Sequence, residues 1–394
     1  MGFLKGLAIS LLSFLLFLSL SVFGVAFMLN GTILNPNFIT SQLDRLDVSL
    51  LAEEILTEQP SEEEFGTDLV NTITKLEPLV KEQVSAAIYS VYDYLLGKRE
   101  SPDLALTLRN TLLSSDFIVS IVDELDISSL AGEVLSEQLA EEIPEETGYM
   151  VEYLDESLDD VITELEPWVK EQVSVAADPI ADYLLGESQS LNIVISMEPV
   201  MESLRDNLRH AFLQSPPSEL AGLPQAELER RFDEFYQEFS EQMPSTFELD
   251  ESLLGTETQA DITEALVEVE KVLEQARQYV GYFQLGYKLL IGFIVLLIAG
   301  IILIDRQVRS FTRKLGITFL SCGVPWLVAT LVSKHFAGRW LAPFDIPSSI
   351  QEFLPAFVND FLAPMLMLSI GLVVVGIVLI TISFVYPKWR KPSV

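Results

Sequence analysis

Hydrophobic residues are concentrated at the two ends of the chain, while charged residues fill its middle. Residues 6–29 contain no charged side chain, and three further apolar runs cover residues 283–304, 315–333 and 361–386. At a rise of about 1.5 Å per residue, each run is long enough to cross the roughly 30 Å hydrocarbon core of a bilayer. The pattern therefore predicts a mainly α protein with four transmembrane helices.

Basic residues between these runs predict the orientation of the helices. Residues 1–5 contain one Lys, residues 305–314 contain four Lys or Arg residues, and residues 387–394 contain three. Because segments rich in Lys and Arg stay on the cytoplasmic side, these three segments are expected to be cytoplasmic. Residues 30–282 and the loop at 334–360 then lie outside the cytoplasm. We expect a multi-pass protein of the cell membrane with a cytoplasmic C-terminus.

The first apolar run is also compatible with a cleaved signal peptide. Lys5 precedes it, and the small residues Gly24 and Ala26 lie near its end. The hydrophobic region of a signal peptide usually has about 7–15 residues, which is shorter than this run. The length favours an uncleaved signal anchor, and on either interpretation the segment that follows is exported.

The middle of the chain has the composition of a water-soluble, strongly acidic domain. Residues 30–283 hold 54 of the 58 Asp and Glu residues and 13 of the 24 Lys and Arg residues, a balance of 13 − 54 = −41. The acidity of this domain argues against nucleic acid or anionic lipid as its partner, because both would be repelled. The single cysteine, Cys322, permits no disulfide within the chain, so packing alone must stabilise this domain.

The acidic domain contains an internal repeat. Residues 38–56 match residues 117–135 at 11 of 19 positions, and residues 73–97 match residues 162–186 at 17 of 25. Two collinear matches of this quality predict two copies of one helical module, at about residues 38–97 and 117–186.

Proline and glycine mark the expected ends of the long helix in each copy. Pro78 and Pro167 suit the first helical position, and Gly97 and Gly186 suit the left-handed position that ends a helix. Pro179 departs from the first copy and predicts a kink or a new helix start.

Two shorter helices are expected in the regions that flank the apolar runs. One covers residues 46–56 and is capped by Asp47 or Ser49. The other begins at Ser348 and has apolar side chains at three- and four-residue spacing. We expect this second helix to lie along the membrane surface, with packing against the acidic domain as the alternative.

The second half of the acidic domain predicts three further segments. The β-branched run at residues 191–197 favours a short strand. Residues 225–243 predict an amphipathic helix, and residues 244–255 are expected to be a linker.

A heptad stripe joins the acidic domain, residues 30–257, to the second transmembrane run. From residue 258 to 282 the apolar residues repeat at spacings of four and three, as in a coiled coil, and the pattern continues into residues 283–304 without a proline. The stripe consists of Ile262, Leu266, Val269, Leu273, Ala276, Val280, Phe283, Tyr287 and Leu290. It predicts a stalk helix that packs on its own domain or on a second copy of the chain, and we favour the former.

Residues with the chemistry of a catalytic or metal site are scarce. His210 and His335 are far apart in sequence, and no nucleotide-binding or hydrolase motif occurs. We predict no catalytic, cofactor-binding or metal-binding residue. No predicted span has a central ionisable residue, since Lys288 lies near an end, which argues against a self-sufficient ion-coupled transporter. Gly323 and Pro325, inside the third span, are expected to serve ordinary helix packing.

Three functions remain compatible with this organisation. The first is a non-enzymatic protein whose outer domain binds or senses a partner, either an envelope protein or a second copy, besides contacting the lipid bilayer. The second is a permease-like subunit of an ATPase-driven envelope complex, because one span, a large outer domain and three further spans resemble the topology of FtsX- and MacB-type proteins. The third is a membrane-tethered enzyme that uses carboxylates.

Overall fold

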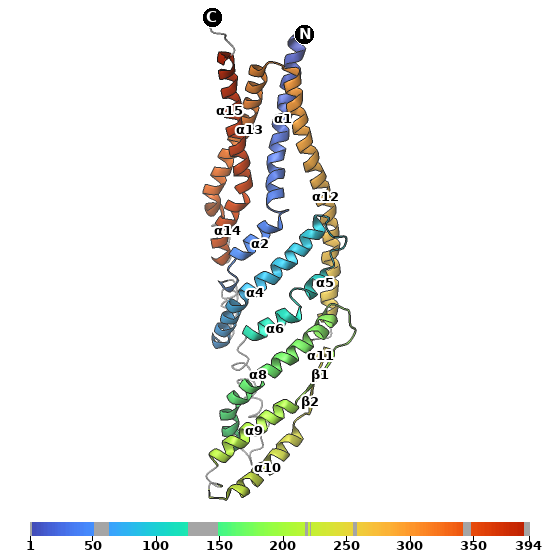
Figure 1. Cartoon of the computed structure of the whole chain (residues 1–394), viewed down its shortest axis with the longest axis vertical. Helices are drawn as coiled ribbons and strands as arrows, with labels where there is room; N and C mark the ends of the chain where they lie inside the picture. The colour runs from blue at the N-terminus through green and yellow to red at the C-terminus, as the bar shows by residue number, and fades with distance from the viewer. Residues whose placement is uncertain are drawn as a thin grey trace. The chain divides into compact units, whose positions relative to one another are not determined.

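The computed structural model is mainly helical and forms two compact units (Figure 1). It describes residues 2–50, 63–124, 149–216, 220, 222–254, 258–341 and 348–389. The first unit, here called the membrane unit, comprises residues 1–77, 85–102 and 271–394. The second unit comprises residues 78–84 and 103–270.

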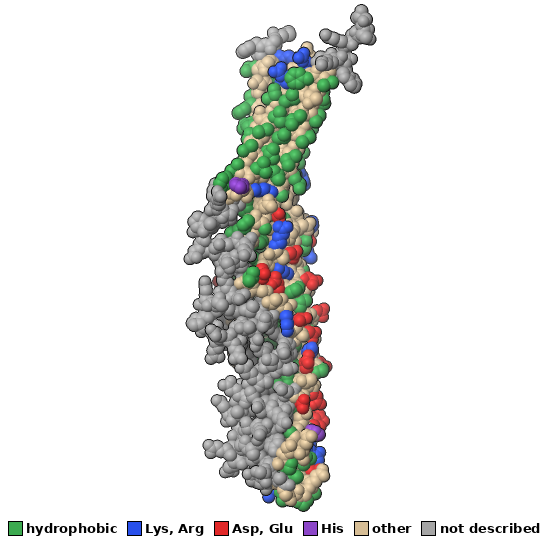
Figure 2. All heavy atoms as spheres, turned by 90° about the vertical axis from the view of Figure 1, so that its left-hand side faces the viewer, with side chains coloured by type: hydrophobic (Ala, Val, Ile, Leu, Met, Phe, Trp, Pro, Cys, Tyr) green, Lys and Arg blue, Asp and Glu red, His purple; other side chains and the backbone are tan. Residues whose placement is uncertain are grey.

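Within the residues that the structure describes, four helices are long and apolar enough to cross a membrane, the same number as the predicted spans. They are α1 (Gly2–Gly31), α12 (Thr258–Ile304), α13 (Val308–Leu341) and α15 (Ala363–Trp389). Figure 2 shows hydrophobic side chains covering the outside of these helices, with Lys and Arg side chains gathered at one end. An apolar exterior of this kind is the surface that lipid chains solvate.

Helix α12 continues from the predicted stalk into the predicted span without a break, over 47 residues. All positions of the heptad stripe are partly covered except Val269, which is exposed. Within the membrane unit the covered side of α12 packs on α1: the Tyr287 ring stacks on Phe23 with centroids 5.6 Å apart. Further along, Leu297 and Ile301 are buried in the same core cluster as residues of α1. The continuous helix is confirmed.

The connection between α12 and α13 is shorter than expected. Residues 305–314 were expected to form a loop, but α13 begins at Val308, so only residues 305–307 lie outside helices. This expectation was wrong because Arg and Lys are good helix formers and no glycine or proline interrupts the segment. At the other end of α13, the predicted short helix is confirmed as α14 (Ser348–Phe361).

Helices α13 and α15 pack closely and run in opposite directions (Figure 1). Small residues recur every seven positions along their contact, at Gly316 and Gly323 of α13 and at Ser369, Gly376 and Ser383 of α15. A Cβ atom added at Gly316 would lie 2.8 Å from the carbonyl oxygen of Gly376, and one at Gly323 would lie 3.1 Å from that of Ser369. In a bilayer, where apolar burial gives helices little reason to associate, such close backbone approach strengthens van der Waals packing. We call these five residues the small-residue seam.

The second unit is built on three helices and a core of its own. Its helices α8 (Tyr149–Leu184), α9 (Glu198–Gln214) and α10 (Gln225–Gln242) share a buried cluster. The cluster consists of Val161, Ile162, Leu204, Leu208, Phe212, Leu228 and Phe232. The predicted helix at residues 225–243 is therefore confirmed as α10. Shorter helices are α5 (Leu104–Arg109), α6 (Ser115–Glu124), which packs on α8, and α11 (Glu251–Leu254).

The predicted strand is confirmed, but its partner was not expected. Strand β1 (Asn192–Ser196) pairs antiparallel with β2 (Thr246–Asp250), so that Val194 lies opposite Glu248. The expectation of a linker over residues 244–255 is wrong for the part that forms β2. The short strand is held by pairing with a segment about fifty residues away, a contact that local sequence does not reveal.

The long helix of each predicted repeat copy begins earlier than the proline pattern indicated. Helix α4 (Glu63–Leu95) contains Pro78 in its interior, and α8 contains Pro167 and Pro179. Neither Pro78 nor Pro167 is a first helical residue, and no new helix starts at Pro179. The expectations for Pro78 and Pro167 were wrong because the acidic segments that precede these prolines are themselves helical. At Pro179 a new helix start is wrong, and the alternative, a kink, stays a prediction.

The predicted ends of α4 and α8 are confirmed. Gly97 and Gly186 have φ angles of +78° and +75°, in the left-handed region that suits glycine. The two chain ends form the same hydrogen bonds: the glycine N–H donates to the residue three positions back, and the next N–H donates to the residue five positions back. The Asp47 carboxylate accepts from the Leu50 N–H at 3.0 Å, as expected of a cap. The rest of the helix predicted at residues 46–56 lies outside the described residues.

Candidate functional site at the ends of helix α12

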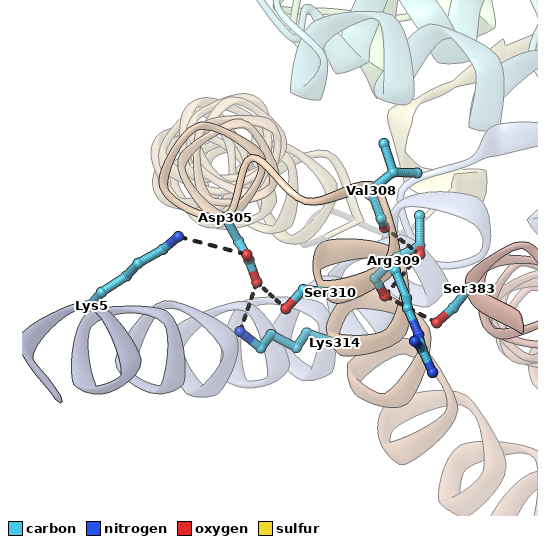
Figure 3. A network of polar contacts seen from close by, with 8 residues as sticks. Lys5, Asp305, Val308, Arg309, Ser310, Lys314 and Ser383 are labelled. Atoms are coloured by element: carbon cyan, nitrogen blue, oxygen red, sulfur yellow. Dashed lines mark hydrogen bonds and ion pairs between the residues drawn. The ribbon is translucent and has the colours of Figure 1, made fainter. Parts of the chain in front are cut away.

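A buried carboxylate holds the end of α12 where the chain turns into α13 (Figure 3). Asp305 follows the last residue of α12 and is only 4% exposed. Its carboxylate accepts a hydrogen bond from the Lys314 ammonium at 2.7 Å and another from the Ser310 hydroxyl. The Lys5 ammonium lies 3.8 Å from its other oxygen. The N-terminal end of α1, the end of α12 and the first turns of α13 therefore meet at one charge.

The surroundings of Asp305 favour its ionised form. Burial raises the pKa of this carboxyl, but the hydrogen bonds from Lys314 and Ser310, together with the charges of Lys314 and Lys5, outweigh burial and lower the pKa below its usual value. A charged Asp305 is thus the stable state at neutral pH. It neutralises one of the two lysines that point at it.

A second polar contact joins α13 to α15 at the same end of the helices. The Ser383 hydroxyl donates to the carbonyl oxygen of Arg309 at 3.0 Å, and Ser383 is 1% exposed (Figure 3). Because Ser383 belongs to the small-residue seam, this bond fixes the register of the seam at its end. Together, Asp305 and Ser383 connect all four candidate spans at this end.

Further along α12, within the membrane unit, Arg277 holds the helix to the end of α4. Its guanidinium lies over the Tyr94 ring, 4.5 Å from the centroid, and donates to the carbonyl oxygen of Glu100 at 2.8 Å. Tyr94 is 3% exposed, so the ring is fixed in place. A cation over an aromatic face and a charge-assisted hydrogen bond are among the stronger single contacts available to a partly exposed arginine.

Tyrosines of α4 extend this contact to α2 (Pro36–Arg45). The Tyr92 hydroxyl donates to the carbonyl oxygen of Ile33 at 2.6 Å, and the Tyr89 hydroxyl donates to the Asn37 side-chain oxygen at 2.7 Å. Both acceptors lie at or just before the start of α2. Side chains at the end of α4 thus fix the segment that follows α1.

Helix α2 in turn contacts α14, whose expected position along the membrane surface stays a prediction. Arg45 forms an ion pair with Asp360, and the Gln42 amide donates to the same carboxylate at 3.3 Å. Beside this polar contact, the rings of Phe38 and Phe357 lie 5.9 Å apart. The alternative expected for α14 was packing against the acidic domain, residues 30–257, and α2 belongs to that segment. A continuous series of contacts therefore runs from α12 through α4 and α2 to α14.

These contacts connect the helices of the membrane unit to one another. The described residues provide few groups with the chemistry of a metal or catalytic site. Among them, no group of three His, Cys, Asp or Glu residues is placed to hold a metal ion. Cys322 is buried in α13, with its sulfur 3.7 Å from the Ser21 hydroxyl of α1.

Sequence reasoning found the helices that carry this site but missed its residues. Asp305 and Lys314 were counted only as parts of a basic loop, and Arg277 was not singled out. One signal was present for Asp305, because it is the only carboxylate within residues 305–314. A single carboxylate among four basic side chains in a short turn is the residue expected to form an ion pair there and to be buried by it.

Comparisons with protein-family models, with characterised proteins and with solved structures find no match to this chain. The class of the molecule therefore follows from its own features: a mainly helical protein with four candidate membrane-spanning helices, one of which continues well beyond a span's length.

Proposed function

We propose that this is a non-enzymatic, multi-pass membrane protein whose acidic helical domain binds or senses a component outside the cytoplasm, and that α12 couples this domain to the membrane helices. The observation that carries the proposal is the continuity of α12. Its 47 residues correspond to about 70 Å of helix, roughly twice what a membrane span requires. A helix with no interruption transmits displacement along its axis, and α12 is held by Arg277 and by Asp305.

Charge distribution supports the orientation in this proposal. Residues 1–5, 305–314 and 387–394 together hold eight Lys or Arg residues and one acidic residue, Asp305, a balance of 8 − 1 = +7. The cytoplasmic side of a membrane protein collects such basic segments. Residues 30–282 then lie on the other side of the membrane.

Internal duplication is part of the same proposal. In support of it, α4 and α8 each end in a glycine of similar φ with the same hydrogen bonds, and a short helix, α2 or α6, precedes each of them. Two copies of one module would present two related surfaces to a partner. The partner is an envelope component or a second copy of this chain.

The proposal is tested by cross-linking the intact protein in its native membrane, followed by mass spectrometry. We expect cross-links from residues 103–250 to an envelope component or to a second copy. A variant with Gly-Gly-Ser inserted after Gly281 interrupts α12, and a matched control carries the same insertion after Lys98, in the exposed turn that follows α4. Partner cross-links should persist in both variants. Partner-dependent changes in the labelling of a cysteine introduced at Gln307 should disappear only when α12 is interrupted.

Three results would overturn the proposal. Protease shaving of intact cells could leave residues 100–250 protected, which would place them in the cytosol. Residues 103–250 could form no cross-links beyond their own chain. The α12 insertion could leave the labelling at position 307 responsive to the partner.

A second function is a permease-like subunit driven by a cytoplasmic ATPase. It is favoured by the three-residue turn between α12 and α13, because force applied to a short turn held by Asp305 reaches α12 directly. Co-purification of an ATPase whose activity changes in the α12 insertion variant would select this function over the first.

A further inference from the structure

One face of α13 remains uncovered along nearly the whole helix. Its exposed residues follow each other at spacings of four and three, which places them on one side of an α-helix. In order, they are Arg309, Arg313, Ile317, Ser321, Val324, Val328 and Leu331. Arg309 precedes Gly316 by seven residues and so borders the small-residue seam, and the later positions of the row lie about a quarter turn away from Gly316 and Gly323. We call the exposed row the α13 ridge; it is cationic in its first turns and almost entirely apolar beyond them.

The arginines at this end of α13 have no acidic partner among the residues that the structure describes. Asp305 is occupied by Lys314 and Lys5, and no carboxylate of a described residue lies within 4.0 Å of Arg306, Arg309 or Arg313. In Figure 3 the Arg309 guanidinium points away from the Asp305 carboxylate. In the sequence, residues 387–394 include Lys and Arg but no Asp or Glu. The positive charge here is therefore uncompensated within this part of the chain.

The four candidate spans, placed in a bilayer, would bring these arginines to its surface. Leu303 at the end of α12 is 73% exposed, and Phe384, next to the Ser383 that donates to the Arg309 carbonyl oxygen, is 64% exposed. Arg309 also lies in the first turn of α13, where the partial positive charge of the helix end adds to that of the guanidinium. Anion-binding groups at the edge of a lipid-facing surface suit a phosphate that is covalently attached to acyl chains.

The part of the ridge from Arg313 to Val324 matches one leaflet of a bilayer in length. From Arg313 to Val324 is eleven residues, or about 16 Å along the helix, and one leaflet contributes about 15 Å of hydrocarbon. An acyl chain that starts at the level of Arg313 would contact Ile317 and Val324 before it reached the bilayer centre.

We propose that the α13 ridge binds an anionic phospholipid, whose phosphate is held by Arg309 and Arg313 and whose acyl chain lies against Ile317 and Val324. The inference requires that the four helices cross a membrane. It depends neither on the role proposed for α12 nor on the side of the membrane that this end occupies. Bidentate guanidinium contacts to phosphate, together with the apolar ridge, distinguish this site from general attraction of anions.

The experiment uses the full-length protein in detergent micelles, with binding of added phosphatidylglycerol or phosphatidylcholine quantified by native mass spectrometry. Wild-type protein should bind phosphatidylglycerol more tightly than phosphatidylcholine. Each arginine near a membrane surface contributes about fivefold to the association of anionic lipid, so R309Q/R313Q should lower the apparent association constant for phosphatidylglycerol about 25-fold. Binding of phosphatidylcholine should change less than threefold.

The matched control is R205Q/R209Q, which removes two arginines at the same four-residue spacing from α9 of the second unit. It should leave lipid binding unchanged. If R309Q/R313Q does not fold, R309K/R313K supplies the test, because it keeps the charge but loses the bidentate geometry, and we expect a fall of about three- to fivefold.

Five outcomes would overturn the inference. The wild-type protein could bind both lipids equally, or R309Q/R313Q could keep its preference. The control could lose as much binding as the ridge variant. Millimolar inorganic phosphate could displace phosphatidylglycerol completely, which would show a site for soluble anions instead of lipid. A finding that these arginines cross-link to an acidic protein in membranes, with lipid binding unchanged by their removal, would likewise replace the lipid with that protein.

Discussion

The contact between α13 and α15 leads to a quantitative prediction for Gly316→Ala. The added Cβ would lie 2.7 Å from Cγ1 of Ile380 and 2.8 Å from the carbonyl oxygen of Gly376. The Ile380 side chain has some freedom to move, but the Gly376 oxygen belongs to the backbone of a helix. The two helices must therefore separate locally, and neighbouring contacts of the small-residue seam would lengthen with them.

The net effect of Gly316→Ala on the free energy of unfolding has two opposing contributions. Replacing glycine with alanine inside a helix favours folding by about 1 kcal/mol, because the alanine backbone loses less conformational freedom. Inserting a methyl group into a closely packed contact costs typically 1–3 kcal/mol. The backbone clash places Gly316 toward the upper end of that range, so we expect a net destabilisation of about 1–2 kcal/mol.

Gly371→Ala is the matched control, because it makes the same chemical change on the partner helix α15. A Cβ atom there would meet nothing within 4 Å, so only the favourable helix term applies and we expect stabilisation of up to about 1 kcal/mol. The assay is SDS-induced unfolding of the full-length protein in mixed micelles, followed by far-UV circular dichroism. If Gly316→Ala proved as stable as Gly371→Ala, the close approach of α13 and α15 would be refuted.

Three further predictions concern polar contacts and helix ends. Asp305→Asn should destabilise the protein at pH 7 by about 1–2 kcal/mol, because its charged hydrogen bonds are lost while the exposed lysines are rehydrated. Folding lowers the pKa of Asp305, so this stabilisation is present above the ordinary carboxyl pKa and is lost as the pH falls through the lowered value. The unfolding midpoints of wild type and variant should therefore converge in acid. Arg277→Gln should remove a contact of about 1 kcal/mol and speed proteolysis in the turn after α4, and unchanged cleavage would contradict the role of this arginine. Gly97→Ala should lower the free energy of unfolding by about 1–2 kcal/mol, because Gly97 has a positive φ. Gly186→Ala should lower it more, because its Cβ would also lie 2.9 Å from a Thr263 methyl. A thermal melt in which both variants lose equal stability, or in which Thr263→Ser restores none of the stability lost in Gly186→Ala, would contradict this ordering.

The spans could be predicted from sequence because a bilayer imposes a simple rule. A run such as residues 6–29, without a charge and longer than the hydrocarbon core, has few stable conformations other than a membrane-crossing helix. The ends at Gly97 and Gly186 were equally predictable, because the left-handed conformation there strongly favours glycine. The heptad stripe predicted the continuity of α12 for a similar reason, since an unbroken period implies an unbroken helix.

The remaining features depend on contacts between distant residues, and local patterns carry little information about these. Pro78 fits a helix start by its own geometry, yet the residues before it are helical. Strand β2 exists through its pairing with β1. Of the small-residue seam, the sequence singled out only Gly323, whose expected role in ordinary helix packing is confirmed. Ser369, the residue that Gly323 faces, could be identified only from the packed helices. Asp305 likewise acquires its role from the positions of Lys5 and Lys314.

The seven-residue period of the small-residue seam restricts how α13 and α15 can slide past one another. A shift of one or two residues would push larger side chains into a space that fits only a hydrogen or a hydroxymethyl group, and small residues would next face each other after about 10 Å of travel. These two helices must therefore move as a single rigid body. In contrast, α12 buries only Ile294, Leu297 and Ile301, so any rearrangement within the bilayer should occur where α12 meets this paired block.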